Sequence, residues 1–169
     1  MTGADRVEVY VSAGSNIEPV KNLRLACSEL EQSSGLLSRS SVYRTKSVGF
    51  EGNDFLNMVM RFSSPLNLDD ILCELERIEN LSDRRRESMP FASRTLDLDL
   101  LLYGDQVVNG PPVSLPRADI TKYAFVLGPM AEMAPGLRHP QSGKTIGELW
   151  AAFDQSAQPI QRLEESPLI

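Results

Sequence analysis

The pattern of apolar and polar residues predicts four strands. Residues 7–12 (VEVYVS) place three valines and a tyrosine before a glycine-containing turn, which is typical of a strand. Residues 55–63 and 95–103 are strand candidates of the same kind, and residues 36–46 form a further extended candidate. We expect these segments to pair in one sheet.

Two helices are predicted between these strands. Apolar residues recur at helical spacing after Pro19, which suits the first turn of a helix, and Gly35 ends that segment. Residues 68–81 repeat the pattern after a start signal at Asn67. The order strand–helix–strand–strand–helix–strand predicts the α+β class, as a ferredoxin-like βαββαβ sandwich in which two helices cover one face of an antiparallel sheet.

The chain from about residue 106 is richer in proline and less regular, and it is predicted to form a C-terminal extension of the same domain. Residues 123–133 are predicted to be helical, and residues 145–153 to form a helical turn or two. We therefore expect one domain over residues 1–155, followed by a weakly ordered tail over residues 156–169.

Composition narrows the function classes. The chain has 169 residues, of which 41% are hydrophobic and 24% charged, as in ordinary globular domains. Its net charge of −6 argues against a nucleic-acid partner, although a local basic patch for a small anion stays open. No apolar run approaches the roughly 20 residues that span a bilayer, and the first residues lack the pattern of a secretory signal. Two cysteines within predicted helices indicate core filling, so a cytoplasmic location without a membrane partner is expected.

The stretch SRTLDLDLLLYG at residues 93–104 carries the strongest candidate chemistry. Side chains alternate along a strand, so Asp97 and Asp99 share one face about 7 Å apart, while the leucines point to the other. At an effective dielectric constant near 20, the two charges repel by about 2.4 kcal/mol unless water screens them. A face open to water is one interpretation. The flanking leucines indicate instead a central, well-packed strand, where paired carboxylates suit Mg²⁺ and a substrate phosphate.

Arginines lie near the acid pair in the sequence. Arg94 precedes Asp97 by three residues, and residues 84–86 are three consecutive arginines. A solvated run after a helix end is the alternative interpretation, and we prefer it for Arg85 and Arg86. Guanidinium groups beside paired carboxylates nevertheless favour triphosphate chemistry, because metal and arginines together neutralise the phosphate oxygens.

Two other features are interpreted as structural. S-G-K-T at residues 142–145 resembles the end of a P-loop, but the position where that motif needs glycine is Arg138. The only histidine, His139, lies in an H-P turn, and one histidine without paired cysteines does not make a zinc site.

Taken together, the motifs resemble those of the 6-hydroxymethyl-7,8-dihydropterin pyrophosphokinases (HPPK) of folate biosynthesis. The signature of that family is an arginine, two residues, then D-[LIV]-D and two aliphatic residues, and it is R-T-L-D-L-D-L-L at residues 94–101. Further matches occur in family order: G-S-N at 14–16, Y-R-T at 43–45, F-L-N at 55–57, R-I-E at 77–79 and A-F-V-L-x-P at 124–129. The resemblance covers roughly residues 7–150 and implies the same ferredoxin-like core.

The resemblance implies roles for the matching positions. Asp97 and Asp99 would bind two Mg²⁺ ions that bridge the phosphates of ATP. Together with Arg84 and Arg94 they form the expected catalytic set, with Arg84 arriving on a loop that closes over the site. The expected ATP-binding residues are Glu79, Arg84, Phe91, Arg94, Leu98, Ser114 and Arg117. The expected pterin-binding residues are Thr45, Val48, Phe55, Asn57, Asp97 and Phe125.

The pterin set is chemically reasonable, because a flat heterocycle suits aromatic faces and an amide on its polar edge. Taken alone, Asn57 is equally consistent with a strand residue facing water. The implied reaction is attack of the pterin hydroxymethyl oxygen on the β-phosphorus of ATP, with AMP leaving and Asp97 a candidate acceptor of the hydroxyl proton. ATP and the pterin are the expected partners of a monomer.

Three departures from the family pattern concern the nucleotide side. Phe91 occupies a position that is often tryptophan, Arg117 and Ala118 replace a common histidine-containing pair, and Tyr123 replaces a basic residue. Two other functions therefore stay open. One is a paralogue that binds pterin or nucleotide with little transfer. The other is an RNA-recognition module, which would need surface aromatics and a basic sheet face.

Overall fold

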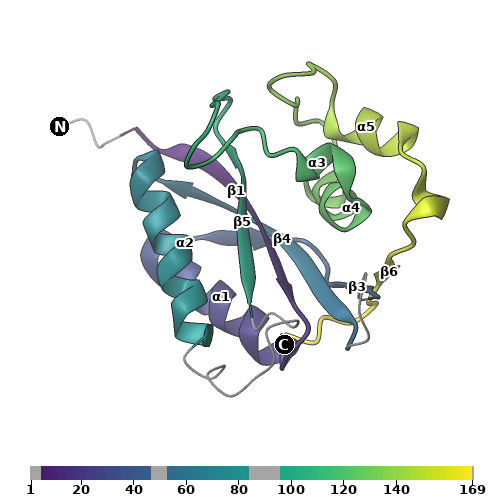
Figure 1. The fold of residues 1–169 in the computed structure, drawn as a ribbon, viewed down its shortest axis with the longest axis horizontal. Coiled ribbons are helices and arrows are strands. Elements are labelled where there is room, and N and C mark those ends of the chain that lie inside the picture. The colour runs from purple at the N-terminus through teal and green to yellow at the C-terminus, as the bar shows by residue number, and fades with distance from the viewer. Residues whose placement is uncertain (1–4, 47–52, 84–95, 169) are drawn as a thin grey trace.

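An antiparallel sheet with helices on both faces organises the chain (Figure 1). The computed structural model describes residues 5–46, 53–83 and 96–168. The strands are β1 (Val7–Ser15), β2 (Leu37–Arg39), β3 (Tyr43–Thr45), β4 (Phe55–Ser64), β5 (Asp97–Tyr103) and β6 (Gln161–Arg162). The helices are α1 (Pro19–Ser34), α2 (Leu68–Asp83), α3 (Asp119–Lys122), α4 (Ala124–Met133) and α5 (Ile146–Ala152), and a 3-10 turn η1 follows at Gln155–Ala157.

The chain order confirms the predicted α+β fold. Within the described residues the strand order is β5-β1-β4-β3-β6, and β2 also pairs with β4. All of these pairings are antiparallel. β1 and β4 form the centre of the sheet, and β1 also pairs with β5. The first and fourth predicted strands therefore lie side by side although helices and two other strands separate them in sequence.

The prediction of a central position for the fourth strand is wrong. Within the described ranges β5 pairs with β1 alone, so it forms one edge of the sheet. Its outer groups are covered by other elements: the Leu98 N–H donates to Glu79 Oε2 at 2.9 Å, and the Arg117 N–H donates to the Leu101 carbonyl at 3.0 Å. The leucine-rich pattern of a central strand also occurs here because both faces of β5 are covered: Leu98 and Leu100 lie in the main core, and Leu101 and Leu102 in the cluster on the other face.

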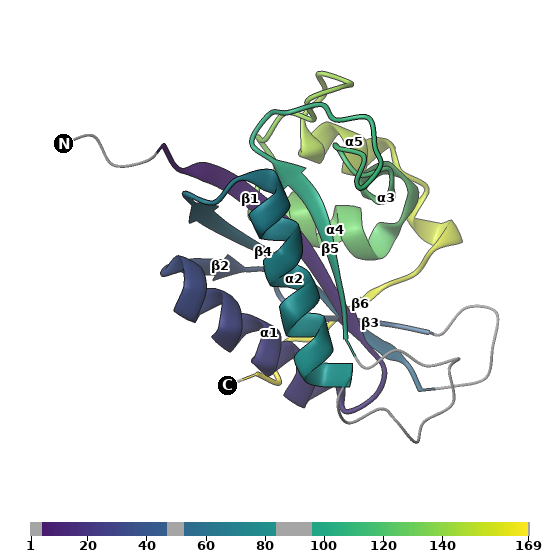
Figure 2. The ribbon, with the colours of Figure 1, turned by 60° about the vertical axis from the view of Figure 1, so that its left-hand side comes forward.

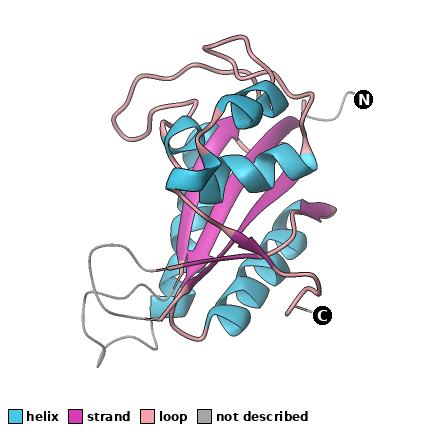
Figure 3. Cartoon of the chain, turned by 90° about the vertical axis from the view of Figure 1, so that its right-hand side faces the viewer, coloured by secondary structure: helices cyan, strands magenta, loops and turns pink. Residues whose placement is uncertain are grey.

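Helices α1 and α2 cover one face of the sheet, as predicted, and Figure 2 shows them side by side. The core beneath them includes Val9, Val11, Leu23, Leu30, Met58, Met60 and Ile78. The opposite face carries a second apolar cluster under α4, made by Tyr10, Val59, Leu101, Val126, Leu127 and Met130 among others. Figure 3 shows helices in front of and behind the strands. The sheet is therefore the middle layer of three.

Local sequence signals explain where the two long helices begin and end. Pro19 is at the first position of α1, and Gly35 ends it with a φ of 90°, a backbone conformation that suits glycine. The Asn67 side-chain oxygen accepts from the Asp70 N–H at 2.8 Å at the start of α2. Among the helices in the described ranges, none combines the length and apolar character that a bilayer crossing requires.

The last described residues run back along the sheet, and we call residues 155–168 the C-terminal strap. They include η1 and β6, which pairs with β3. Leu168 is buried in the main core, and the Arg24 side chain donates to its carbonyl at 3.2 Å. The expected boundary at residue 155 stays a prediction, but these contacts connect the segment that follows it to both the sheet and α1.

Candidate active site

The acid pair lies on the α4 side of the sheet. Asp97 and Asp99 are half-buried, whereas Leu98 and Leu100 are buried in the main core on the other face. This confirms the predicted alternation along the strand. In the register of β1 with β5, Asp99 is opposite Ser12 and Asp97 is opposite Gly14. The carboxylates therefore lie above the end of β1 that leads into α1.

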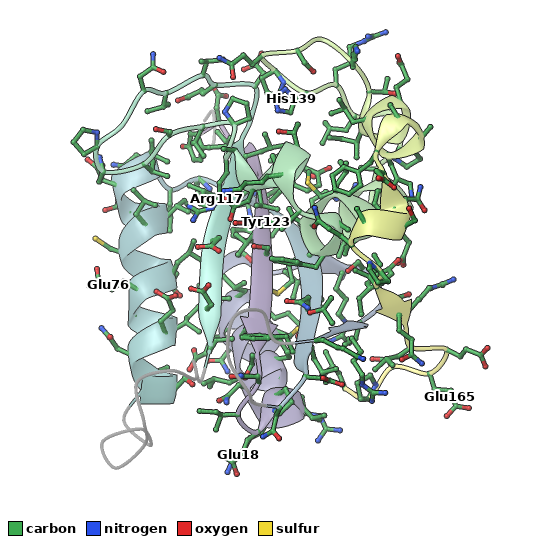
Figure 4. The ribbon with its side chains drawn as sticks, turned by 45° about the vertical axis from the view of Figure 1, so that its right-hand side comes forward. Glu18, Glu76, Arg117, Tyr123, His139 and Glu165 are labelled. Atoms are coloured by element: carbon green, nitrogen blue, oxygen red, sulfur yellow. The ribbon has the colours of Figure 1, made fainter. Side chains whose placement is uncertain are left out.

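Arg117 supplies positive charge at the acid pair. Its Nη2 is 3.2 Å from Asp99 Oδ1, and its Nε donates to Asp119 Oδ2 at 3.1 Å. Figure 4 shows Arg117 beside β5, on the side of the sheet where Tyr123 lies. Burial lowers the pKa of this guanidinium, but the charges of Asp99, Asp119 and Asp97 outweigh burial and leave the pKa raised. The sequence position that departs from the family pattern thus contacts one of the signature acids.

A polar row crosses the sheet from Asp97. Gly14 on β1 is opposite both Asp97 on β5 and Asn57 on β4, and Asn57 is opposite Tyr43 on β3. Asn57 is only 5% exposed, and its side-chain Nδ2 donates to Thr45 Oγ1 at 2.9 Å. It is therefore a buried, oriented amide, and the alternative of an asparagine facing water is wrong.

Glycine at position 14 leaves room in this row. A Cβ atom placed there would lie 2.9 Å from Asn57 Oδ1, closer than side-chain contacts allow. The absence of a side chain at Gly14 therefore leaves room between the Asp97 carboxylate and the Asn57 amide on this face of the sheet. Gly14 belongs to the G-S-N motif at residues 14–16, but the sequence alone predicts no role for it.

The two predicted aromatic residues come from different elements. Phe55 begins β4 opposite Thr45, and Phe125 is in the first turn of α4. Phe125 is half-buried and stacks on Tyr123, with ring centroids 5.0 Å apart and planes 19° apart. Lys122 places its Nζ 5.2 Å from the centroid of the Tyr123 ring. The start of α4 thus presents paired aromatic rings with a nearby cation.

A cleft of about 320 Å³ opens where α2 meets the edge strand β5. Three of its lining residues, Glu79, Leu98 and Arg117, are among the predicted ATP-binding residues. Asp99 also lines it, so the cleft reaches the acid pair. Its remaining lining residues are Leu72, Leu75, Glu76, Leu100, Pro112 and Val113. The cleft thus combines apolar walls with a charged end.

Sequence reasoning missed the apolar walls of this cleft. Leu72, Leu75 and Glu79 follow helical spacing and share one face of α2, a signal that could have marked that face as facing β5. Pro112 and Val113 come from a proline-rich loop without a periodic pattern, so no signal in the sequence pointed to them.

Of the remaining predicted site residues, the structure describes Ser114 but not four others. Ser114 is exposed, and its Oγ accepts from the Gly110 N–H at 3.1 Å within the loop that contributes Val113 to the cleft. Four predicted site residues lie outside the described ranges: Val48, Arg84, Phe91 and Arg94.

The two features interpreted as structural lie in a turn between α4 and α5. His139 is 7% exposed, and its Nδ1 accepts from the Ser142 N–H at 3.1 Å. Thr145 caps α5 by accepting from the Glu148 N–H at 3.1 Å. The S-G-K-T stretch therefore forms a turn and a helix cap, and among the described residues no strand leads into it.

Comparison with known proteins agrees with this geometry. A sequence model of the family described as "7,8-dihydro-6-hydroxymethylpterin-pyrophosphokinase (HPPK)" matches residues 10–135. The 2-amino-4-hydroxy-6-hydroxymethyldihydropteridine pyrophosphokinase of Haemophilus influenzae is 35% identical over 151 residues, covering 87% of this chain and 93% of that protein. The protein of the same description from Synechocystis is 37% identical over 150 residues, covering 87% of this chain and 76% of that protein.

Solved structures show the same fold at much lower identity. The wild-type HPPK-DHPS of Plasmodium falciparum matches 89% of this chain with a TM-score of 0.70 and 12% identity, and the chain spans 45% of that protein. That likeness shows the fold alone. The family match, which covers most of the chain, shows more: the chain belongs to the 7,8-dihydro-6-hydroxymethylpterin-pyrophosphokinase family.

Proposed function

We propose that the protein transfers the diphosphoryl group of ATP to the hydroxymethyl oxygen of 6-hydroxymethyl-7,8-dihydropterin, the pyrophosphokinase reaction of its family in folate biosynthesis. One observation carries the proposal. Asp99 lines the cleft beside α2, while Asp97 is in the same cross-strand row as Asn57. The acid pair therefore lies between the cleft and a buried amide, where the diphosphoryl group would pass from one substrate to the other.

On the nucleotide side, the cleft offers apolar walls from Leu72, Leu75 and Val113 to a flat base. Arg117 at its charged end suits a triphosphate, because a guanidinium binds phosphate oxygens with parallel hydrogen bonds. Glu79 supports this side by accepting from the Leu98 N–H, which fixes the strand that carries both acids.

On the pterin side, Asn57 is held by Thr45, so its amide is already oriented when substrate arrives. An amide supplies both a donor and an acceptor, which matches the polar edge of a pterin ring. Phe55 and Phe125 supply aromatic faces. Gly14, between Asp97 and Asn57 in the register, adds no Cβ atom that would collide with the Asn57 amide.

The acid pair fits the expected metal. Asp97 and Asp99 are half-exposed carboxylates on one face, and hard oxygen ligands of this kind suit Mg²⁺, which commonly takes one or two carboxylates plus substrate phosphates. Within the described residues no third His, Cys, Asp or Glu completes a cluster, so phosphate oxygens would supply the other ligands. When bound, two Mg²⁺ ions would neutralise charge on the triphosphate and orient it.

The residues of the chain would then act mainly by position. The pterin hydroxymethyl oxygen bonds to the β-phosphorus as the bond from that phosphorus to the α–β bridging oxygen breaks, and AMP leaves with that oxygen. Asp97, which is nearer than Asp99 to Asn57 in the cross-strand row, is proposed to accept the hydroxyl proton. Arg117 would stabilise the charge on the phosphates. Arg84 and Arg94 are proposed to do the same, and Arg84 to arrive on a closing loop.

A direct assay tests the proposal. Incubation with Mg²⁺, ATP and 6-hydroxymethyl-7,8-dihydropterin should release AMP and the pterin diphosphate in equal amounts. Asp97→Asn should lower that rate at least about a hundredfold while the protein stays folded, because the change removes charge and keeps shape. Tight binding of the pterin without AMP release would overturn the proposal in favour of a paralogue that binds without transfer.

Two accompanying expectations are also proposals. We expect a monomer, which light scattering on the purified chain would check, and a cytoplasmic location, which fractionation of the source cells would check.

Arg84→Ala should slow single-turnover transfer, and an unchanged single-turnover rate would exclude the proposed role of its loop.

A further inference from the structure

The C-terminal strap contacts β3 and α4, the elements that carry two of the predicted pterin-binding residues, Thr45 and Phe125. Figure 1 shows this yellow segment running from α5 past β6 and β3 toward α1. It lies beyond residues 10–135, the part of the chain that the family model matches. Nothing in the family match therefore assigns it a role.

The first contact is at the start of α4. Tyr123 is at the N-cap position of this helix and makes no side-chain capping bond. Gln158 takes that place: its Oε1 accepts from the Ala124 N–H at 3.0 Å, and its Nε2 donates to the Lys122 carbonyl at 3.0 Å. One side chain thus binds the backbone on both sides of the N-cap and satisfies a helix N–H that would otherwise lack a partner. Phe125 is the next residue of this turn.

The second contact is along β3. Arg162 is paired with Tyr43, and the Leu163 N–H donates to the Val42 carbonyl at 2.9 Å. Two residues after Tyr43, β3 ends at Thr45, which holds the Asn57 amide. The strap therefore supports the strand that orients this amide.

Side chains reinforce the link between β3 and α4. Glu132 of α4 accepts from the Tyr43 hydroxyl at 2.6 Å and from the Ser41 N–H and hydroxyl at 2.9 Å each. Arg162 donates to Ser41 Oγ at 3.0 Å and lies 4.0 Å from Glu132 Oε1. The strap, β3 and α4 thus share one polar cluster.

The packing of the strap also depends on a missing side chain. A Cβ atom at Gly128 of α4 would lie 2.8 Å from Ile160 Cδ1 and 3.2 Å from Trp150 Cη2. Glycine at this helical position costs helix stability relative to alanine but admits the strap against the helix. The close approach explains why a residue of low helix propensity is found inside α4.

We propose that the C-terminal strap holds the two walls of the pterin site at a fixed separation, with Gln158 as a positioning residue for Phe125. This inference rests on the proposed function, since it takes Phe125 and Asn57 to contact the pterin. The physical reason is preorganisation: stacking on a flat ring needs a fixed aromatic plane, and an uncapped first turn frays. Gln158 touches no substrate and acts through the backbone of α4.

The test compares three variants of the full chain. Gln158→Met keeps length and volume but removes both hydrogen bonds. Gln158→Glu keeps the acceptor for the Ala124 N–H. Gln161→Met is the matched control, because Gln161 is exposed on the same strap and its backbone still pairs with β3. For each variant we would measure the Kd of 6-hydroxymethyl-7,8-dihydropterin without nucleotide, and separately the Kd of α,β-methylene-ATP with Mg²⁺.

Gln158→Met should weaken pterin binding about five- to tenfold, the loss expected for one helix cap, and leave nucleotide binding within about twofold. Gln158→Glu should recover part of the pterin affinity, and Gln161→Met should match the wild type. The inference would be overturned if Gln158→Met bound the pterin as tightly as the wild type. It would also be overturned if the change weakened pterin binding and nucleotide binding by the same factor. If Gln158→Met does not fold, Gln158→Glu decides by the same criterion. A wild-type protein that releases no AMP when given Mg²⁺, ATP and the pterin would overturn the proposed function, and this inference with it.

Discussion

Arg117, at a position that departs from the family pattern, supplies positive charge beside the acid pair. Two carboxylates on one strand face repel each other, and the sequence offered no partner within the strand itself. Arg117 lies eighteen residues beyond Asp99 in the chain but 3.2 Å from it in the fold. Its backbone is fixed by the hydrogen bond from its N–H to Leu101, so its position depends on the strand that carries the acids.

Removal of the Arg117 charge should weaken nucleotide binding. Arg117→Met is expected to raise the Kd of ATP with Mg²⁺ about tenfold, because the triphosphate loses a charged hydrogen-bond donor. Isothermal titration of both proteins checks this. Arg61→Met is the control, since Arg61 forms an ion pair with Glu8 at the other end of β1. An equal ATP affinity for wild type and Arg117→Met would place Arg117 outside the nucleotide site.

Gly14→Ala should disturb the pterin side. The added Cβ would lie 2.9 Å from Asn57 Oδ1, and Asn57 is buried and bonded to Thr45, so its amide must move. We expect pterin affinity to fall at least about tenfold, with a smaller effect on ATP. Gly136→Ala is a suitable control because a Cβ there meets nothing within 4 Å. Unchanged pterin affinity in Gly14→Ala would mean that the amide does not contact the pterin.

At the scale of elements, periodicity predicted the long segments well. The spacing of apolar residues located α1, α2 and the three longer strands, because each buries a regular face against the core. The predicted helices at 123–133 and 145–153 correspond to α4 and α5, whereas α3, η1 and β6 were not predicted. Residues 36–46 form two strands rather than one, separated where Ser40 exchanges hydrogen bonds with Val59: its N–H donates to the Val59 carbonyl and its Oγ accepts from the Val59 N–H, at 2.9 Å each. Here the Ser40 hydroxyl takes the place of a backbone carbonyl as acceptor, and such a break between two strands leaves no periodic pattern in the sequence.

The position of β5 at the sheet edge gives Glu79 a structural function as well as a place in the cleft. Glu79→Met should lower the free energy of unfolding by about 1 to 2 kcal/mol, because the Leu98 N–H loses its acceptor. Glu79→Gln keeps an acceptor oxygen and should lose less. Urea unfolding of the two variants checks the order, and equal losses would show that the charge of Glu79 matters rather than its hydrogen bond.

At the scale of the whole molecule, the predictable part of the site is the part that one strand or one motif defines. That Asp97 and Asp99 share one face followed from the alternation of side chains along a strand. Asn57 and Arg117 were predicted as site residues because they occupy positions of the family motifs. The cleft was not predictable in the same way, since α2, β5 and a proline-rich loop build it together. The strap was missed because its contacts join residues more than 30 positions apart, such as Gln158 and Ala124.

The cluster that joins the strap to the domain should make stability depend on pH. Burial raises the pKa of Glu132, but hydrogen bonds from Tyr43 and Ser41 and the charge of Arg162 outweigh it and leave the pKa below its ordinary value near 4.5. A lowered pKa contributes stability above the ordinary value, and that contribution is lost as pH falls through the folded-state pKa. Between about pH 5 and pH 3, the Tm of the wild type should therefore fall by more than the Tm of Glu132→Gln.

Thermal unfolding in steps across that range checks the prediction. Glu165→Gln is the control, because Glu165 is an exposed carboxylate on the strap. A Tm difference between wild type and Glu132→Gln that stays constant from pH 6 to pH 3 would contradict the proposed linkage.

The place of β1 in the sheet also bears on protein synthesis. β1 is synthesised before the other strands, yet one of its neighbours, β5, begins only at Asp97. The part of the strap that pairs with β3 follows about 65 residues later, at Arg162. At roughly 5–20 residues per second, a ribosome needs several seconds to add the residues between these two positions. A nascent chain that stops before β5 lacks the acids, and one that stops before β6 lacks the strap. Substrate binding is therefore expected to appear only after β5 and the strap have both been synthesised.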